Sequence, residues 1–328
     1  FPRAASKVRV AASISIGATP PGVWPAGAPL PPPPVPPAWA AGFVLVWDWT
    51  WRTYSDLGLA AEHFDLIYID PPFNTGRVQE RTRIRTLRDD VGGDRTGFKG
   101  ARYRTEVLGS QGYEDSWDDF LAFVEPRFME ARRILKPSGS FFLHIDYREA
   151  HYCKVMLDGI FGRDAFINEI IWAYDYGART KKRWSSKHDT ILWYARNPRD
   201  YVFNFDEMDR IPYMAPGLVT PEKAARGKTP TDVWWHTIVS PNAKEKTGYP
   251  TQKPLGILER IVKVHSNPGD QLLDFFAGSG SFGEAGARHE RDVVLIDQNP
   301  EAIEVMRRRL EDRFDVTIQS PSTKARAQ

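Results

Sequence analysis

The sequence predicts an α/β fold in which a mostly parallel sheet carries helices on both faces. Two observations lead to this prediction. Strand-like and helix-like segments alternate over residues 43–160, and the alternation returns over residues 255–313. The strand-like segments are short apolar runs, as in strands buried on both faces. Strands that alternate with helices pack as parallel strands joined by helical crossovers.

The first half of the chain is assigned from its apolar pattern. We expect strands at residues 43–46, 66–69 and 141–145, and helices at residues 54–62, 116–135 and 147–160. The helix over 116–135 has apolar residues at helical spacing, and the sequence KPSG ends it. Two further strands are predicted in FINEIIWAY and DTILWYA, joined by the basic segment GARTKKRWSSKH.

The second half repeats the alternation more sharply. The predicted order is a helix at residues 255–265, a strand at 271–275, a helix at 282–288, a strand at 292–296 and a helix at 300–313. Residues 319–328 are expected to form a tail.

Three segments lack the pattern of regular structure. Residues 1–42 hold ten prolines between positions 20 and 37, which favours polyproline II and predicts an arm or linker. Residues 74–112 are rich in Gly, Arg and Asp without sustained periodicity, so we expect a long mobile loop. Residues 198–250 carry seven prolines, which indicates an irregular insertion or a smaller domain.

Composition restricts the class of protein. The 328 residues are 41% hydrophobic and 26% charged, which is ordinary for a soluble protein. The single cysteine, Cys153, excludes an internal disulfide framework and a cysteine-rich zinc site. No run approaches the ~18 to 20 apolar residues of a membrane span. The N-terminus resembles a targeting peptide only faintly, because no apolar core follows its basic residues. We therefore expect a cytoplasmic protein without a metal site.

Positive charge is concentrated in two segments. Residues 77–104 contain nine Arg or Lys against four Asp or Glu, and residues 179–187 contain five cations in nine positions. Basic loops interleaved with aromatic residues suit a phosphate backbone and unstacked bases, although either run alone could be solvated surface charge. The candidate DNA contacts in them are Arg81, Arg83, Arg85, Arg179, Lys181, Lys182, Arg183 and Lys187.

The segment FDLIYIDPPFNTG raises the first question about chemistry. An apolar strand leads to Asp70, and Pro71, Pro72 and Phe73 follow. Prolines end strands because they cannot donate to the ladder, so a simple strand terminus is one interpretation. The other is a carboxylate, a rigid backbone and an aromatic ring placed together at the edge of a sheet.

The segment LLDFFAGSGSFGEAG is predicted to be a strand, a glycine-rich turn and a helix. Gly278 and Gly280 bracket Ser279, where a larger side chain would keep a ligand away from the backbone, and the helix behind presents unpaired N–H groups. The next strand ends in Asp297, which is placed to hold ribose hydroxyls. The pattern indicates a nucleotide-like ligand. A P-loop triphosphate site is excluded, because the chain lacks that motif.

Together, DLIYIDPPFNTG and the downstream TQKPLGILERIVKVHSNPGDQLLDFFAGSGS resemble the β-class DNA amino-methyltransferases. The resemblance covers about residues 43–315 and includes FLAFVEPRFMEARRILKPSGSFFLHID and NEIIWAYDYGARTKKRWSSKHDTILWYAR. It implies a Rossmann-like, mostly parallel seven-stranded sheet in a circularly permuted order, with the catalytic motif before the cofactor motif. Asp48 stands where the family usually has Gly-Asp, with Trp47 in place of the glycine.

The resemblance implies transfer of a methyl group from S-adenosyl-L-methionine to an exocyclic amine of a base flipped out of duplex DNA. The amine is a poor nucleophile because its lone pair is delocalised into the ring. The Asp70 carboxylate and the Pro71 carbonyl would accept its N–H groups, Pro72 would keep that carbonyl rigid, and Phe73 would stack on the base. This chemistry requires no metal and no covalent intermediate.

The same resemblance assigns the cofactor site. Asp297 would take the ribose, and Thr251 and Lys253 would approach the methionine carboxylate. The other implied cofactor contacts are Asp48, Asp70, Asp274, Phe276, Ala277, Gly278 and Gly280.

The resemblance also divides the chain into functional parts. Residues 43–197 would be the catalytic half, 251–318 the cofactor half and 198–250 the target recognition region, with DVWWHTIVS among the DNA contacts. For the pair Trp234 and Trp235, core packing and base contact both remain open.

An aspartate before Pro-Pro favours adenine N6 as the target, with cytosine N4 as the alternative. RNA or protein amine methylation is disfavoured, because such enzymes usually have Asn-Pro-Pro-Tyr and an upstream cofactor motif. A non-catalytic DNA-binding relative would show degenerate motifs. Double-stranded DNA is the expected partner, with a cognate restriction endonuclease and a homodimer as further possibilities, and the expected place of action is the prokaryotic nucleoid.

Overall fold

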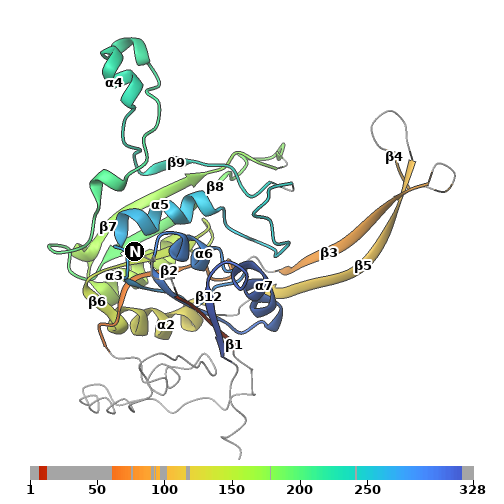
Figure 1. The fold of residues 1–328 in the computed structure, drawn as a ribbon, viewed down its shortest axis with the longest axis horizontal. Coiled ribbons are helices and arrows are strands. Elements are labelled where there is room, and N and C mark those ends of the chain that lie inside the picture. Colours follow the sequence, from red (N-terminus) through yellow and green to blue (C-terminus); the bar gives the residue numbers. More distant parts are fainter. Residues whose placement is uncertain are drawn as a thin grey trace, which may run out of the picture.

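The computed structural model describes residues 7–12, 61–74, 77–89, 92, 94–96, 102–115, 119–177, 179–240 and 242–319. Within them, one large sheet forms the centre of the molecule (Figure 1). Its strands run in the order β12 (Asp315–Gln319), β1 (Lys7–Ala12), β11 (Asp292–Asp297), β10 (Gln271–Asp274), β2 (Phe64–Ile69), β6 (Leu135–Ile145), β8 (His188–Ala195), β7 (Phe166–Ala173) and β9 (Val233–Trp235).

The sheet is mostly parallel, as the sequence predicts. The pairs from β12 through β6 are all parallel, β8 runs antiparallel to both β6 and β7, and β9 pairs parallel with β7. The strands β1, β11, β10, β2, β6, β8 and β7 form a seven-stranded centre, and β12 and β9 extend it at the two edges.

Helices cover both faces of the sheet. One core cluster joins α2 (Phe120–Ile134) and α3 (Ala150–Phe161) to one face, and a second joins α5 (Leu255–His265), α6 (Ser281–Arg288) and α7 (Pro300–Leu310) to the other. The strands alternate between the clusters: Val293 and Leu295 of β11 pack on the α5–α7 side, and Val294 and Ile296 on the α2–α3 side. Burial of each large apolar side chain contributes about 1.5–3 kcal/mol.

The predicted helices and strands in the described regions are confirmed, with small shifts at most ends; the exception is β6, which begins at Leu135 and includes KPSG, whereas the strand was expected only over 141–145. The α5 helix has its predicted bounds, whereas α2 begins at Phe120 rather than at residue 116. At the start of α2, the side chain of Asp119 accepts a hydrogen bond from the backbone N–H of Ala122. Asn299 caps α7 in the same way, because its side chain accepts the backbone N–H of Glu301, and a proline fits the first turn of that helix.

The prediction that residues 74–112 lack regular structure is wrong. Strands β3 (Arg77–Arg88) and β5 (Arg102–Asp115) pair antiparallel along their length, and β4 (Arg95–Thr96) pairs with β5. They form a hairpin that projects far from the sheet (Figure 1). The sequence contains the signal: positions 78, 82, 84 and 86 are Val, Thr, Ile and Thr, and β-branched residues at alternate positions favour a strand.

The expectation of an arm over residues 1–42 is also incomplete, because residues 7–12 form β1 inside the sheet between β11 and β12. The predicted strand at 43–46 and Asp48 lie outside the described residues. Of the predicted helix at 54–62, only residues 61 and 62 are described, and they form a turn.

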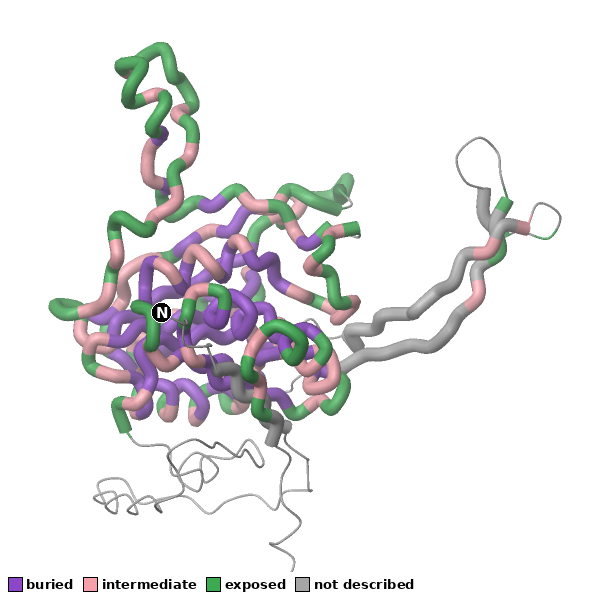
Figure 2. The backbone as a smooth tube through the Cα atoms, viewed as in Figure 1, coloured by how far each residue is buried: buried purple, intermediate pink, exposed green. Residues whose placement is uncertain are grey.

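Residues 198–250 contain little regular structure, as predicted. They hold the 3-10 turns η3 (Phe205–Glu207) and η4 (Pro216–Leu218), the short helix α4 (Pro221–Arg226) and strand β9. An isolated bridge between Ile211 and Lys228 closes a lobe around α4, which projects from the body and is mostly exposed (Figure 2). In the described part of the chain, no helix has both the length and the apolar character needed to cross a membrane.

Candidate functional site

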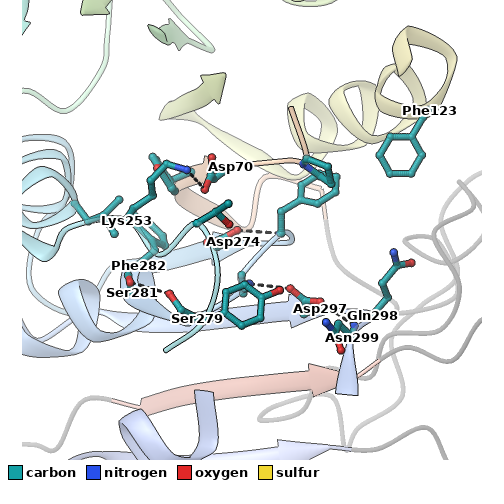
Figure 3. Close-up of a pocket in the computed structure, with 18 residues that line it drawn as sticks. Asp70, Phe123, Lys253, Asp274, Ser279, Ser281, Phe282, Asp297, Gln298 and Asn299 are labelled. Carbon is teal, nitrogen blue, oxygen red and sulfur yellow. Dashed lines mark hydrogen bonds and ion pairs between the residues drawn. The ribbon is translucent and has the colours of Figure 1, made fainter. Parts of the chain in front are cut away.

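The two sequence motifs meet at one edge of the sheet. Strands β2 and β10 are parallel neighbours, with Leu66 opposite Leu272 and Ile67 opposite Leu273. Asp70 follows β2 and the glycine-rich turn follows β10, so both lie at the carboxyl ends of adjacent strands, where ligands bind in open α/β sheets. Figure 3 shows the resulting cleft, whose lining includes the predicted residues Asp70, Pro72, Thr251, Lys253, Asp274, Phe276, Ala277, Gly278 and Asp297.

The glycine-rich turn has a backbone that requires glycine. Gly278 and Gly280 have φ angles of 49° and 71°, in the left-handed region. A Cβ atom at Gly280 would lie 2.7 Å from Cγ of Met306, and one at Gly278 would lie 3.1 Å from the Tyr249 ring. Helix α6 begins directly after Gly280, and no side chain caps it. The turn therefore presents bare backbone and the N-terminus of a helix to the cleft.

Two buried carboxylates hold this turn. Asp297 accepts the backbone N–H of Gly278 at 2.7 Å and that of Asn299 at 2.8 Å, and burial raises its pKa to about 6. Asp274 accepts the N–H of Phe276 at 2.9 Å, and burial raises its pKa well above its ordinary value. A carboxylate has about four lone-pair sites, so Asp297 keeps acceptor capacity for a ligand in addition to its bonds to the backbone.

The catalytic candidate Asp70 is held on one side only. Lys253 Nζ donates to Asp70 Oδ2 at 2.5 Å, and the two side chains are 9% and 16% exposed. Asp70 Oδ1 is buried and has no hydrogen-bond partner among the described residues. The same Lys253 ammonium lies 4.7 Å from the centroid of the Phe73 ring. In this structure Lys253 therefore contacts the catalytic motif, a contact that the sequence does not predict.

A second, wider cleft of about 820 Å³ adjoins the first. Phe73 lines it, together with Trp172 and Tyr174. Three residues line both clefts: Tyr249, Thr251 and Lys253. Thr251 has a φ of 58°, which is strained for a β-branched residue and typical of functional sites. The two clefts are therefore adjacent, and these three residues form the wall between them. Asp70 lines the first cleft, and Phe73 lines the second.

The basic segment 179–187 borders the second cleft in part. Arg179 and Arg183 line it. Arg179 forms an ion pair with Asp175 at 2.8 Å, and Lys187 donates to the carbonyl of Tyr176 at 2.6 Å. Lys181 and Lys182 are exposed. Arg81, Arg83 and Arg85 belong to β3, and their side chains are outside the described part of the structure.

The structure places one of the two β9 tryptophans in the core and leaves base contact by the other untested. Trp234 is 7% exposed and packs in the core beside α5, whereas Trp235 is 74% exposed. Sequence reasoning missed Tyr249, Phe123 and Asn299 as lining residues of the first cleft. No spacing rule identifies them, because they come from three segments far apart in the chain.

The comparisons with known proteins agree with this arrangement. The family model described as DNA methylase (N6_N4_Mtase) matches residues 64–308, which contain both motifs. The chain belongs to the N6/N4 DNA methylase family. This family uses S-adenosyl-L-methionine to methylate an exocyclic amine of a DNA base.

Two curated relatives are similar over most of the chain. The type II methyltransferase M.HpaI of Haemophilus parainfluenzae is 29% identical over 257 residues, which cover 78% of this chain and 71% of the relative. The DNA adenine methyltransferase YhdJ of Escherichia coli is 29% identical over 261 residues, which cover 77% and 78%.

Solved structures share the fold. The PvuII DNA methyltransferase, which is cytosine-N4-specific, superposes with a TM-score of 0.53 at 14% identity, over 79% of this chain and 83% of its own. The Thermus thermophilus protein TTHA0409, complexed with S-adenosyl-L-methionine, gives a TM-score of 0.50 at 18% identity, over 85% and 98%.

Proposed function

We propose that this DNA methylase transfers the methyl group to N6 of adenine in duplex DNA and that Asp70 is the residue that receives the target amine. One observation carries the proposal. Asp70 Oδ1 is a buried acceptor without a partner among the described residues, at the wall between the two clefts. A buried acceptor without a donor costs free energy, which a donor on a bound ligand would remove.

The residues of the first cleft suit the cofactor. Gly278 lines this cleft, Gly280 shapes the turn behind it, and the uncapped start of α6 favours a negatively charged or hydrogen-bond-accepting group. Asp297 retains lone pairs for ribose hydroxyls. Thr251, Phe276 and Ala277 supply further walls. When bound, S-adenosyl-L-methionine supplies a sulfonium methyl group, an electrophile that needs no metal.

The chain's own residues activate the amine. Asp70 Oδ1 and the Pro71 carbonyl accept its two N–H groups, which localises the nitrogen lone pair and aims it at the methyl group. The amine must lose one proton when it is methylated, and Asp70 Oδ1, which accepts its N–H group, would take up that proton. Lys253 holds Oδ2, so only Oδ1 faces the amine. Its ammonium also prevents the Asp70 carboxylate from turning away.

The second cleft would receive the flipped base. Phe73 offers a ring for stacking, and Arg179 and Arg183 lie at the same cleft, where they can contact the phosphates beside the base. The hairpin of β3 and β5 carries nine Arg or Lys over residues 77–104, which supports a role in gripping the duplex. Residues 198–250 would form the target recognition region, with the lobe around α4 and the exposed Trp235 as its contacts.

The choice of base rests on Asp70. Within the resemblance that the sequence carries, an aspartate before Pro-Pro accompanies adenine N6 chemistry. YhdJ, one of the relatives, is an adenine methyltransferase, which agrees. Cytosine N4 is the second candidate, because the PvuII enzyme shares the fold and is cytosine-N4-specific. Both amines are planar and conjugated, so both can donate to a carboxylate.

The proposal also includes a restriction endonuclease partner, an assembly state and a place of action. The type II name of M.HpaI supports a cognate restriction endonuclease with the same recognition sequence. A homodimer is the proposed assembly, and the proposed place of action is the nucleoid of a prokaryotic cell.

The experiment is long-read sequencing of DNA from a methylation-deficient host that expresses the chain, beside a host that expresses Asp70→Ala. The proposal predicts N6-methyladenine within one sequence motif in the first host and none in the second. Modification at cytosine would overturn the base assignment, and equal modification in both hosts would overturn the role of Asp70.

A further inference from the structure

A chain of buried hydrogen bonds runs behind the catalytic motif. The Tyr68 hydroxyl lies 2.8 Å from Nδ1 of His144, and Nε2 of His144 lies 3.2 Å from Oδ2 of Asp189. Tyr174 donates its hydroxyl to Oδ1 of Asp189 at 3.4 Å. Tyr68 and His144 are essentially inaccessible to solvent, and Asp189 is nearly so. Strands β2, β6 and β8 and the residue that follows β7 supply the four members.

The direction of each hydrogen bond follows from the carboxylate. Burial acts to raise the pKa of Asp189, but the hydrogen bond from His144 and the charges around it outweigh this, so the pKa lies below its ordinary value. Asp189 is therefore ionised and accepts from both neighbours. Nε2 of His144 therefore donates to Oδ2 of Asp189, and Nδ1 lies within hydrogen-bond distance of the Tyr68 hydroxyl. Burial raises the pKa of Tyr68 well above its ordinary value, so its hydroxyl keeps the proton.

The chain of hydrogen bonds fixes a ring that contacts the catalytic motif. The His144 ring stacks on Phe73, with centroids 6.0 Å apart and an interplanar angle of 29°. Trp172 meets the His144 ring edge-on, at 5.4 Å and 90°. With hydrogen bonds at both nitrogens and aromatic rings beside it, His144 has no freedom to rotate. Phe73 therefore packs against a ring whose plane is set by Tyr68 and Asp189.

The ends of the hydrogen-bond chain lie in different clefts. Tyr68 lines the first cleft and stacks on Phe282 at 5.2 Å, whereas Asp189 and Tyr174 line the second. These hydrogen bonds thus connect the linings of the two clefts through the buried His144. A side chain that moved within this chain of hydrogen bonds would shift Phe73 relative to the methyl donor.

We propose that His144 is a positioning residue for methyl transfer: held by Tyr68 and Asp189, it sets the plane of Phe73 and hence the place of the target base. This inference rests on the proposed function, in which Phe73 stacks on that base. His144 does not touch the reacting atoms. Because a misplacement of about 1 Å can cost roughly 100-fold in rate, loss of this support should slow the chemical step more than it weakens binding.

The test compares His144→Leu with a matched control, His265→Leu. His265 is also buried among aromatic rings, those of Phe142, Trp193 and Phe203, and these rings lie away from Phe73. Single-turnover methyl transfer is measured with labelled S-adenosyl-L-methionine on unmethylated genomic DNA, and cofactor affinity by calorimetry. We expect His144→Leu to lower the transfer rate by about 10- to 100-fold with cofactor affinity within about twofold, and His265→Leu to lower it by less than about threefold.

A double-mutant cycle with Phe73→Leu gives the decisive readout. If His144 acts through Phe73, the double variant should be no more than about threefold slower than Phe73→Leu alone. Independent, multiplicative effects would overturn the inference, as would equal losses in His144→Leu and His265→Leu. If Phe73→Leu alone leaves the rate unchanged, the stacking role in the proposed function fails instead. Asp189→Asn serves in place of His144→Leu if the latter does not fold, with the same outcomes expected.

Discussion

If Asp297 holds the ribose, as we propose, cofactor binding should depend on pH. Burial raises its pKa to about 6 in the free protein, whereas ribose hydroxyls bind best to the ionised form. At pH 7 about 90% of the carboxyl is ionised, and at pH 5 only about 10%, so affinity should fall by about tenfold between these values, or about 1.4 kcal/mol. The sign is fixed: binding strengthens as pH rises through the pKa, and cofactor binding releases a proton.

The assay is calorimetric titration with S-adenosyl-L-methionine from pH 5 to pH 7 in two buffers that differ in ionisation enthalpy. At pH 6 the wild-type protein should release about half a proton per cofactor bound. The control is Asp297→Asn, which has no titrating group at this position; it should bind more weakly at pH 7 and lose the part of the pH dependence centred near pH 6, while any part that comes from Asp274 remains. The reasoning is refuted if wild-type affinity is the same at pH 5 and pH 7, or if the variant keeps the wild-type pH dependence.

Changes at four other places test the site and its DNA contacts. Asp70→Ala should abolish methyl transfer while cofactor affinity stays within a few-fold, because we propose that Asp70 contacts the base; measurable transfer on unmethylated genomic DNA would contradict this. Lys253→Met leaves the Asp70 carboxylate buried without its cation, so it should lower the free energy of unfolding by about 3 kcal/mol in denaturant titrations. Adding Asp70→Asn to the same variant removes the unpaired charge and should largely restore the stability. Gly280→Ala places a Cβ 2.7 Å from Met306 at a φ of 71°, so it should cost about 1–3 kcal/mol of stability and weaken cofactor binding. Gly269→Ala is the control for the backbone part of that cost, because its φ is 86° and no atom lies within 4 Å of the added Cβ. Hydrogen exchange in the β3–β5 hairpin should slow when DNA binds. When Arg81, Arg83 and Arg85 are neutralised together, the slope of log DNA affinity against log salt concentration should become less steep by about 3.

The parts of the fold that the sequence predicts are those with a local signal. The α5 and β10 segments are apolar runs with helical or strand spacing, and their positions are confirmed. Strand β1 has only a short local signal, valine at positions 8 and 10, and its partners β11 and β12 lie at the other end of the chain. The β3–β5 hairpin was missed for another reason: its many arginines suggest a solvated loop, although its alternating β-branched residues favour a strand.

In the candidate site too, the sequence predicts the parts that have a local signal and not the contacts between distant residues. Asp70 and the glycine-rich turn could be placed together from the sequence, because parallel strands bring their carboxyl ends to one edge of the sheet. The contact between Lys253 and Asp70 joins residues 183 positions apart, and no periodicity indicates it. His144 lies within the apolar run FFLHID, where a buried histidine looks like part of the core until its partners Tyr68 and Asp189 are seen.

In the proposed mechanism, Asp70 presents a single acceptor to the exocyclic amine of adenine. The most direct measurement is mass spectrometry of nucleosides from unmethylated duplex DNA incubated with the protein and S-adenosyl-L-methionine, beside the same reaction with Asp70→Ala. We expect N6-methyladenine with the wild-type protein and no methylated nucleoside with the variant. N4-methylcytosine without N6-methyladenine would contradict the base assignment, and N6-methyladenine formed equally by Asp70→Ala would contradict the mechanism.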